Sequence, residues 1–170
     1  MISGAELRAR EAEARRRGSG ITPESIVGVW VLQQLWGRRG EGQTAAAALL
    51  RSLSACLAIT AARSADGSTC LQLSNSVRLG LLELQFTGPG RLSGRRPLLR
   101  FHFEQLQLLW AHRPLWQTSL PPVAAEQEPF FALIATERPG ERVAEREQVE
   151  GWLAARGRGG GLALWALRPA

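Results

Sequence analysis

Short stretches of alternating apolar and polar residues recur along most of this chain, and they predict β-strands. Alternation places every second side chain on the same face of a strand, as in a sheet buried on one side. The expected strands are residues 29–35, 56–62, 69–75, 77–86, 97–110, 130–136, 152–155 and 162–168. About eight strands at this spacing are typical of a mostly β, antiparallel barrel or sandwich.

The strand expected at 97–110 changes its apolar face part of the way along. Leu99, Phe101 and Phe103 share one face, and the other face carries Arg100, His102 and Glu104. Beyond Glu104 the apolar positions move to Leu106 and Leu108. A change of phase of this kind indicates a β-bulge or a barrel corner near residues 104–105.

Turns and a few short helices are expected between the strands. Residues 64–68, 88–90 and 93–94 predict turns because they contain Asp-Gly, Gly-Pro-Gly and Ser-Gly. Thr22 and Pro23 mark the start of a brief helix, as N-cap and first helical residue. The alanine-rich stretch 44–53 favours a short lid or crossover helix, and the charged stretch around 141–150 keeps a helical alternative.

Residues 1–20 predict a flexible, charged N-terminal arm ahead of one domain at 21–170. Glutamates and arginines four residues apart support a solvated helix there; the pairs are Glu6–Arg10, Glu11–Arg15 and Glu13–Arg17. The run Arg15-Arg16-Arg17 could contact acidic lipid head groups or RNA, but a solvated tail is the favoured interpretation.

The composition fits a globular protein whose charge says little about partners. Apolar residues make up 45% of the chain, which argues against disorder. All 21 cationic residues are arginine and the net charge is +6, a pattern typical of a GC-rich genome. A basic module for RNA or an acidic partner, using the arm and Arg95-Arg96, stays open. Nucleic acid is disfavoured, because aromatic residues are not interleaved with the arginines.

Cysteine use and hydropathy bear on the compartment. Cys56 and Cys70 are expected to be core thiols in a reducing environment, with a cross-strand bridge as the alternative. The first twenty residues contain no apolar signal core. The most apolar candidate span, 43–62, has Arg51 at its centre, so we expect a cytoplasmic protein, at most peripheral to a membrane.

No catalytic or metal-binding pattern stands out. His102 and His112 have no cysteine or acid at ligand spacing, so no metal is expected. There is no nucleophile elbow and no pair of carboxylates, and the glycines at 157–161 lack the strand and helix of a phosphate loop. The expectation is a protein without catalytic activity and without a cofactor.

A barrel of about eight strands leaves room for side chains or for one small ligand. Six aromatic residues on predicted strands could line such an interior: Trp30, Phe86, Phe101, Phe103, Phe131 and Trp165. Each of them alone is explained as well by filling the core.

Three short motifs resemble the plastid lipid-associated protein (fibrillin) family, in particular a cyanobacterial member. They are Gly28-x-Trp30-x-Leu32, then Asn75 followed by Arg100-Phe101-His102-Phe103-Glu104, then Arg156-Gly157 with Gly160 before the strand at 162–167. The resemblance spans about residues 26–168.

The resemblance implies a lipocalin-like barrel that binds or carries a hydrophobic molecule without catalysis. The ligand would be a prenyl quinone, carotenoid or acyl lipid, at or near photosynthetic membranes such as the thylakoid. Arg156 or Arg168 would cap the barrel by stacking over Trp30, the favoured role, or would face a ligand head group.

Two alternatives remain open. A lipocalin-type bilin lyase or chromophore chaperone would need Arg100, His102 and Glu104 to point into the cavity. An assembly factor with a filled barrel would need no ligand.

Overall fold

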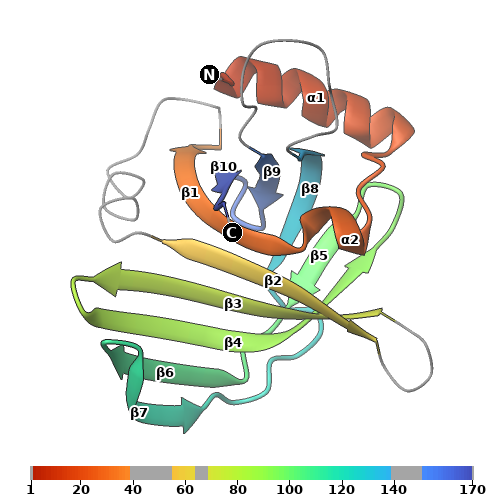
Figure 1. Cartoon of the computed structure of the whole chain (residues 1–170). Coiled ribbons are helices and arrows are strands. Elements are labelled where there is room, and N and C mark those ends of the chain that lie inside the picture. Colours follow the sequence, from red (N-terminus) through yellow and green to blue (C-terminus); the bar gives the residue numbers. More distant parts are fainter. Residues whose placement is uncertain (1, 39–54, 64–68, 139–150, 170) are drawn as a thin grey trace.

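Two helices and ten strands form the part of the chain that the computed structural model describes, residues 2–38, 55–63, 69–138 and 151–169 (Figure 1). The helices are α1 (Gly4–Arg17) and α2 (Pro23–Ile26). The strands are β1 (Gly28–Trp36), β2 (Cys56–Arg63), β3 (Thr69–Leu79), β4 (Leu82–Ser93), β5 (Leu98–Phe101), β6 (Gln105–Trp110), β7 (Arg113–Ser119), β8 (Phe130–Glu137), β9 (Trp152–Gly157) and β10 (Leu162–Leu167).

Eight of the strands close into an antiparallel barrel. Around the barrel, each strand is hydrogen-bonded to the next in the order β1-β2-β3-β4-β5-β8-β9-β10. The pair of β10 with β1 closes the circle. The closing pair sets Trp30 opposite Leu167 and Trp36 opposite Leu162. Closure removes the exposed edges that an open sheet of this size would present. The expected eight-stranded β-barrel is therefore confirmed.

Strand β4 pairs with two strands in succession along the same edge. Its second half, 90–93, pairs with β5, whereas its first half, 82–87, pairs with β6. Strand β6 then pairs with β7 and with no barrel strand except β4. As a result β3, β4, β6 and β7 extend beyond the barrel as a sheet (Figure 1), which we call the extension.

The corner between barrel and extension corrects three predicted boundaries. Residues 97–110 are two strands, β5 and β6, separated at 102–104, where the change of apolar phase indicated a corner. Residues 88–90 are not a turn but lie inside β4, and β3 continues through Leu79 without a break at 76. A Cβ at Gly88 would overlap the carbonyl oxygen of His102, and one at Gly90 would overlap Leu73. These glycines therefore serve close packing at the corner rather than a turn.

Some of the other expectations lie within the described residues, and some lie outside them. The short helix after Thr22 is present as α2, and it begins with a capping box formed by Thr22 and Ser25. The turn at 93–94 is also present, between β4 and β5. The turn at 64–68 and the helices at 44–53 and 141–150 lie outside the described residues.

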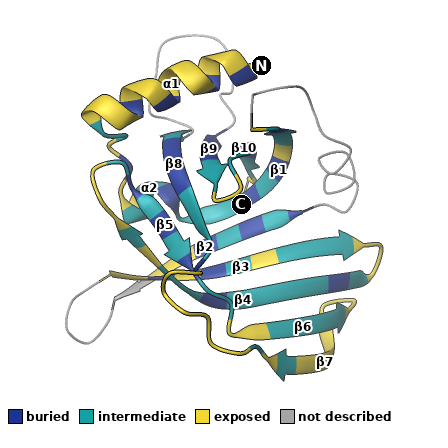
Figure 2. Ribbon diagram, turned by 180° about the vertical axis from the view of Figure 1, so that it is seen from behind, coloured by how far each residue is buried: buried dark blue, intermediate teal, exposed yellow. Residues whose placement is uncertain are grey.

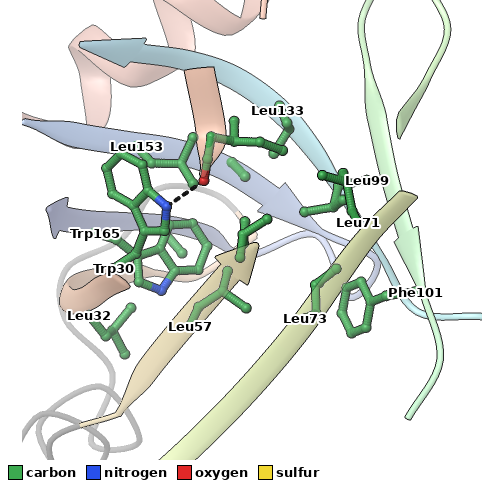
Figure 3. Packing of buried hydrophobic residues seen from close by; sticks show 14 of the residues in the cluster. Trp30, Leu32, Leu57, Leu71, Leu73, Leu99, Phe101, Leu133, Leu153 and Trp165 are labelled. Carbon is green, nitrogen blue, oxygen red and sulfur yellow. Dashed lines mark hydrogen bonds between the residues drawn. The ribbon is translucent and has the colours of Figure 1, made fainter. Parts of the chain in front are cut away.

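The inner face of the barrel holds the main core. Trp30 is fully buried and its Nε1 donates a hydrogen bond to the carbonyl of Ile26 at 2.8 Å (Figure 3). Leu57 of the neighbouring strand β2 lies directly opposite it, and Leu99 and Leu153 belong to the same buried cluster. Burial in this cluster, with the polar end of the indole satisfied, accounts for the position of Gly28-x-Trp30 at the start of the barrel.

Helix α1 is not a solvated arm. Figure 2 shows its buried residues turned toward the sheet, and Leu7 is fully buried. It packs on the outer wall of the barrel against Ile134, Trp152 and other apolar residues of β8–β10. A register shift in β1 between Leu32 and Gln34 turns Trp36 to this outer side, where it joins the same cluster. The charge pattern indicated a solvated helix, although a narrow stripe of buried residues runs along one side of it.

One buried carboxylate fastens α1 to the barrel. Glu11 accepts two hydrogen bonds from Arg156 of β9, at 2.7 and 2.5 Å. Arg96 and Arg15 donate to the same group at 2.6 and 3.0 Å. Burial alone would raise the pKa of Glu11, but the hydrogen bonds and charges of Arg156 and Arg15 outweigh it and lower the pKa to about 2.

The two cysteines do not match the expectation of core thiols. Cys70 is exposed and Cys56 is half-buried. They form no disulfide, because the register of β2 and β3 sets Cys56 opposite Ser76 and Cys70 opposite Ala62.

Replacing Gly88 with alanine should open the corner of β4. The added methyl group has no space beside the His102 carbonyl, so we expect a loss of more than about 2 kcal/mol in the free energy of unfolding. Denaturant unfolding measures it. Gly159→Ala is the control, since nothing lies within 4 Å of a Cβ there. Equal stabilities for the two variants would contradict the role of Gly88.

Glu11→Gln should lower stability at neutral pH and remove a component of its pH dependence. The folded pKa of Glu11, about 2, lies below the ordinary value of 4.5, so its stabilisation is complete above pH 4.5 and is lost as the pH falls toward 2. The shift corresponds to about 3 kcal/mol. Unfolding curves between pH 2 and 7 measure it.

Glu13→Gln is the matched control, because Glu13 pairs with Arg17 at the exposed side of the same helix. It should change stability by less than about 0.5 kcal/mol. If Glu11→Gln behaved like this control, the proposed fastening of α1 would be wrong.

Candidate functional site

A cavity of about 310 Å³ opens at one end of the barrel, where β1 ends, β2 begins and β9 turns into β10. Its wall consists of inward-facing residues of most barrel strands. They are Leu32, Leu35, Ala55, Cys56, Leu57, Asn75, Val77, Phe101, Phe103, Phe131, Gly157, Gly161, Ala163 and Trp165. The volume lies at the lower end of the range for ligand pockets, roughly 300–1,000 Å³.

Five aromatic rings form a continuous row, and four of them line this space. Phe86 contacts Phe103, Phe103 contacts Phe101, Phe101 contacts Phe131, and Phe131 contacts Trp165. Neighbouring ring centroids lie 5.3–5.5 Å apart, and the rings are tilted or edge-on. Aromatic pairs favour this geometry, so the row is a rigid apolar wall.

Small residues beside the rings create the space. Gly157 and Gly161 flank the β9–β10 turn and Ala163 follows at the start of β10. A Cβ at Gly157 would meet only the edge of Phe131, at 3.9 Å, and Gly161 at 4.0 Å. The glycine at 157 is therefore not required by packing, and its missing side chain leaves room in the cavity.

The polar groups at the cavity are few and uncharged. Asn75 contributes a carboxamide at the rim, where its side chain is exposed. Cys56 also borders the cavity, but its sulfur lies 3.2 Å from Nη2 of Arg168 on the outer side. None of the described residues that line the cavity is charged. A carboxamide both donates and accepts hydrogen bonds, so the site suits an apolar molecule with one carbonyl or hydroxyl group.

Four of the six aromatic residues expected at a ligand site line the cavity: Phe101, Phe103, Phe131 and Trp165. The other two do not. Trp30 is core, held by its bond to Ile26, and Phe86 lies behind Phe103 at a centroid distance of 5.5 Å. The alternation pattern identifies an inward face, but it does not distinguish the filled part of the barrel from the hollow part.

Neither arginine expected to close the barrel does so. The Arg156 side chain lies on the outer wall and binds Glu11, which raises the pKa of its guanidinium through those hydrogen bonds. Arg168 is exposed on the outer side, with Nη2 at 3.2 Å from the Cys56 sulfur. Position 156 is even-numbered in a strand whose odd-numbered residues, such as Leu153 and Ala155, face inward. Stacking over Trp30 is therefore excluded by strand geometry.

The polar side chains of residues 100–104 also stay outside the cavity. Arg100 lies over the ring of Phe130, at 5.6 Å from its centroid. His102 lies between Glu104, at 3.2 Å, and the buried Glu128, at 3.5 Å. Glu128 in turn pairs with Arg91 at 2.5 Å. A bilin site would need Arg100 and His102 to point into the cavity. Both side chains instead make their contacts outside it.

Several cavity residues were missed in the sequence, among them Leu35, Leu57, Val77 and Ala163. Leu35 faces inward only because of the register shift in β1. No local sequence pattern predicts this shift. Asn75 was noted as part of a family motif, and its place at the rim now provides a physical reason to consider it.

The described residues contain neither a metal-binding cluster nor a membrane-spanning helix. No group of three or more histidine, cysteine, aspartate or glutamate side chains could hold a metal ion there. None of the described helices is long and apolar enough to cross a membrane.

Comparison with known proteins leaves the site to be interpreted from its geometry. The chain matches no family model, no curated protein sequence and no solved structure.

Proposed function

We propose that this protein binds a small, largely apolar molecule in the open end of its barrel and does not transform it. The observation that carries the proposal is the cavity itself, walled by four aromatic rings and aliphatic side chains, with Asn75 as its uncharged amide at the rim. A filled barrel would have larger side chains at positions 157 and 163, where the chain has glycine and alanine. A Cβ at Gly157 would meet no atom closer than 3.9 Å.

Apolar burial supplies enough free energy for this role. Covering about 200 Å² of ligand surface at about 25 cal/mol per Å² contributes about 5 kcal/mol before the cost of association. The rigid aromatic row adds affinity because little side-chain freedom is lost when a ligand enters.

The volume constrains the ligand class. A cavity of about 310 Å³ accepts one ring or a segment of chain, so a long molecule would extend from the mouth over the apolar side of the extension. Of the classes that the family resemblance implies, a prenyl quinone or an acyl lipid fits best, since each has one carbonyl- or hydroxyl-bearing end. A rigid carotenoid would insert only one end ring. We propose photosynthetic membranes as the source of this ligand.

Filling the cavity should abolish binding while leaving the fold intact. In Gly157→Leu the new side chain extends toward Phe131 into the space that the ligand would occupy. We expect at least a tenfold loss of affinity, about 1.4 kcal/mol, for a fluorescent fatty acid titrated in the absence of membranes. Gly159→Leu is the control, because its side chain has open space and lies outside the cavity wall.

The same pair of variants identifies the ligand. Native mass spectrometry after incubation with a detergent-solubilised photosynthetic-membrane extract should show one bound quinone or lipid on the parent chain and on Gly159→Leu, and none on Gly157→Leu. Binding that is equal in all three proteins, or absent from the parent chain, would overturn the proposal. A bound bilin would replace it with the chromophore-handling alternative.

A further inference from the structure

The extension ends in two hairpin turns that lie side by side. The turn between β3 and β4 consists of Gly80 and Leu81, and the turn between β6 and β7 consists of Ala111 and His112. The amide of Ala111 donates a hydrogen bond to the carbonyl of Leu81 at 2.8 Å, which ties the turns together. Both turns point away from the barrel (Figure 1).

Large apolar side chains gather at these turns. Six large hydrophobic residues are exposed among the described residues, and five of them are here: Leu79, Leu81, Trp110, Leu115 and Trp116. We call these five the tip surface. Trp110 and Trp116 are 51% and 52% exposed and Leu79 is 67% exposed. Exposed apolar residues are normally scattered singly over a protein surface, so a concentration of this kind marks a contact surface.

The turn between β6 and β7 keeps its shape at a cost. Ala111 and His112 both have positive φ, 46° and 65°, which a two-residue hairpin turn of this type requires. Asn-Gly is the favoured pair for such a turn, and other residues are strained in this region of backbone space. The turn therefore lacks the residue pair that favours this backbone conformation. Trp110 is the last residue of β6, directly before the turn.

Charge around the tip surface is positive. Arg113 follows the turn as the first residue of β7, while Glu83 of β4 is paired with Arg78 at 2.7 Å and lies 3.8 Å from His112. The whole chain carries +6. Tryptophan and leucine beside arginine suit the boundary between lipid head groups and acyl chains.

A second copy of the chain is a poorer occupant. β7 is the edge strand of the described sheet, but Pro114 within it has no N–H to donate to a new strand. Two copies would also bring Arg113 of each chain near the other, where the like charges repel. An anionic lipid surface complements both the apolar residues and Arg113.

We propose that the tip surface docks this protein on a bilayer containing anionic lipids, with Trp110 and Trp116 inserted at the head-group level. An apolar path then joins bilayer and cavity: Asn75, Val77 and Leu79 alternate along one face of β3 from the rim to the tip. A groove of about 120 Å³ lies on this path, lined by Val77, Leu79, Leu84 and Leu108 among others. That this path delivers ligand rests on the proposed function; the docking does not.

Vesicle flotation tests the docking. The parent chain should float with phosphatidylcholine vesicles that contain phosphatidylglycerol, and less well with phosphatidylcholine alone. Trp110→Ser combined with Trp116→Ser should weaken partitioning at least tenfold. Val123→Ser is the matched control, since Val123 is the one exposed large hydrophobic outside the tip surface among the described residues. Arg113→Gln should reduce the preference for anionic vesicles.

Tryptophan fluorescence locates the contact. Of the six tryptophans, four are buried, so a brominated lipid in the vesicles should quench Trp110 and Trp116 selectively. Unchanged flotation of the double variant, or no quenching, would overturn the proposal. Loss of a parent-chain dimer in the double variant, measured by light scattering, would assign the surface to a second copy instead.

The two proposals fail separately. Gly157→Leu should still float with vesicles but not bind a fluorescent fatty acid, whereas the double tryptophan variant should bind the fatty acid in solution but not float. Fatty-acid binding lost only in Gly157→Leu, with flotation kept in both variants, would contradict the docking and leave the cavity proposal standing.

Discussion

The divided pairing of β4 is the constraint on which the rest of this structure depends. One strand edge cannot serve two neighbours without bending, and the bend occurs at Gly88 and Gly90, where side chains have no space. The half that pairs with β5 completes the barrel. The half that pairs with β6 leads out of it and carries the extension. The open end of the barrel and the apolar sheet beside it thus arise from a single feature, so a change at the corner affects both.

The barrel is filled at one end and hollow at the other because residue size changes along the same strands. Around Trp30 the barrel is packed with apolar side chains, and the indole nitrogen of Trp30 is bound to Ile26. Toward the mouth, Gly157 of β9 and Ala163 of β10 are small, and the rings of Phe101, Phe103 and Phe131 form a rigid wall beside them. Packing at near-crystalline density tolerates few voids, so a space of this size needs stiff walls to persist. The row of tilted rings supplies them.

Much of this architecture could be predicted from the sequence, and the failures share a cause. Alternation located the barrel strands, and the change of phase after Glu104 indicated the corner, because both are local properties of side-chain direction. Gly88 and Gly90 suggested a turn, since glycine marks a turn and a close approach equally well. Strand β7 was missed because Pro114 and the turn at Ala111-His112 carry no hairpin signal. Glu11 was taken for a solvated acid, because its partners Arg96 and Arg156 stand 85 and 145 residues away. Where a local sequence pattern fits two structures equally well, long-range contacts decide which structure forms.

Charge and function are spatially separated in this protein, and the separation explains the character of the cavity. The buried carboxylates Glu11 and Glu128 lie in ion pairs with arginines outside the cavity wall, where they fasten α1 and the loop before β8. The cavity wall contains no charge among its described residues, so no ionic group has to be desolvated when an apolar molecule enters. Under the proposed function, recognition depends on shape, length and one amide at Asn75. A site of this kind would select a class of molecules rather than a single one, because a methylene group more or less changes the binding free energy by only about 1 kcal/mol. Selectivity would then come from where the protein is placed, and the proposed docking surface beside the cavity mouth is a physical means of placing it.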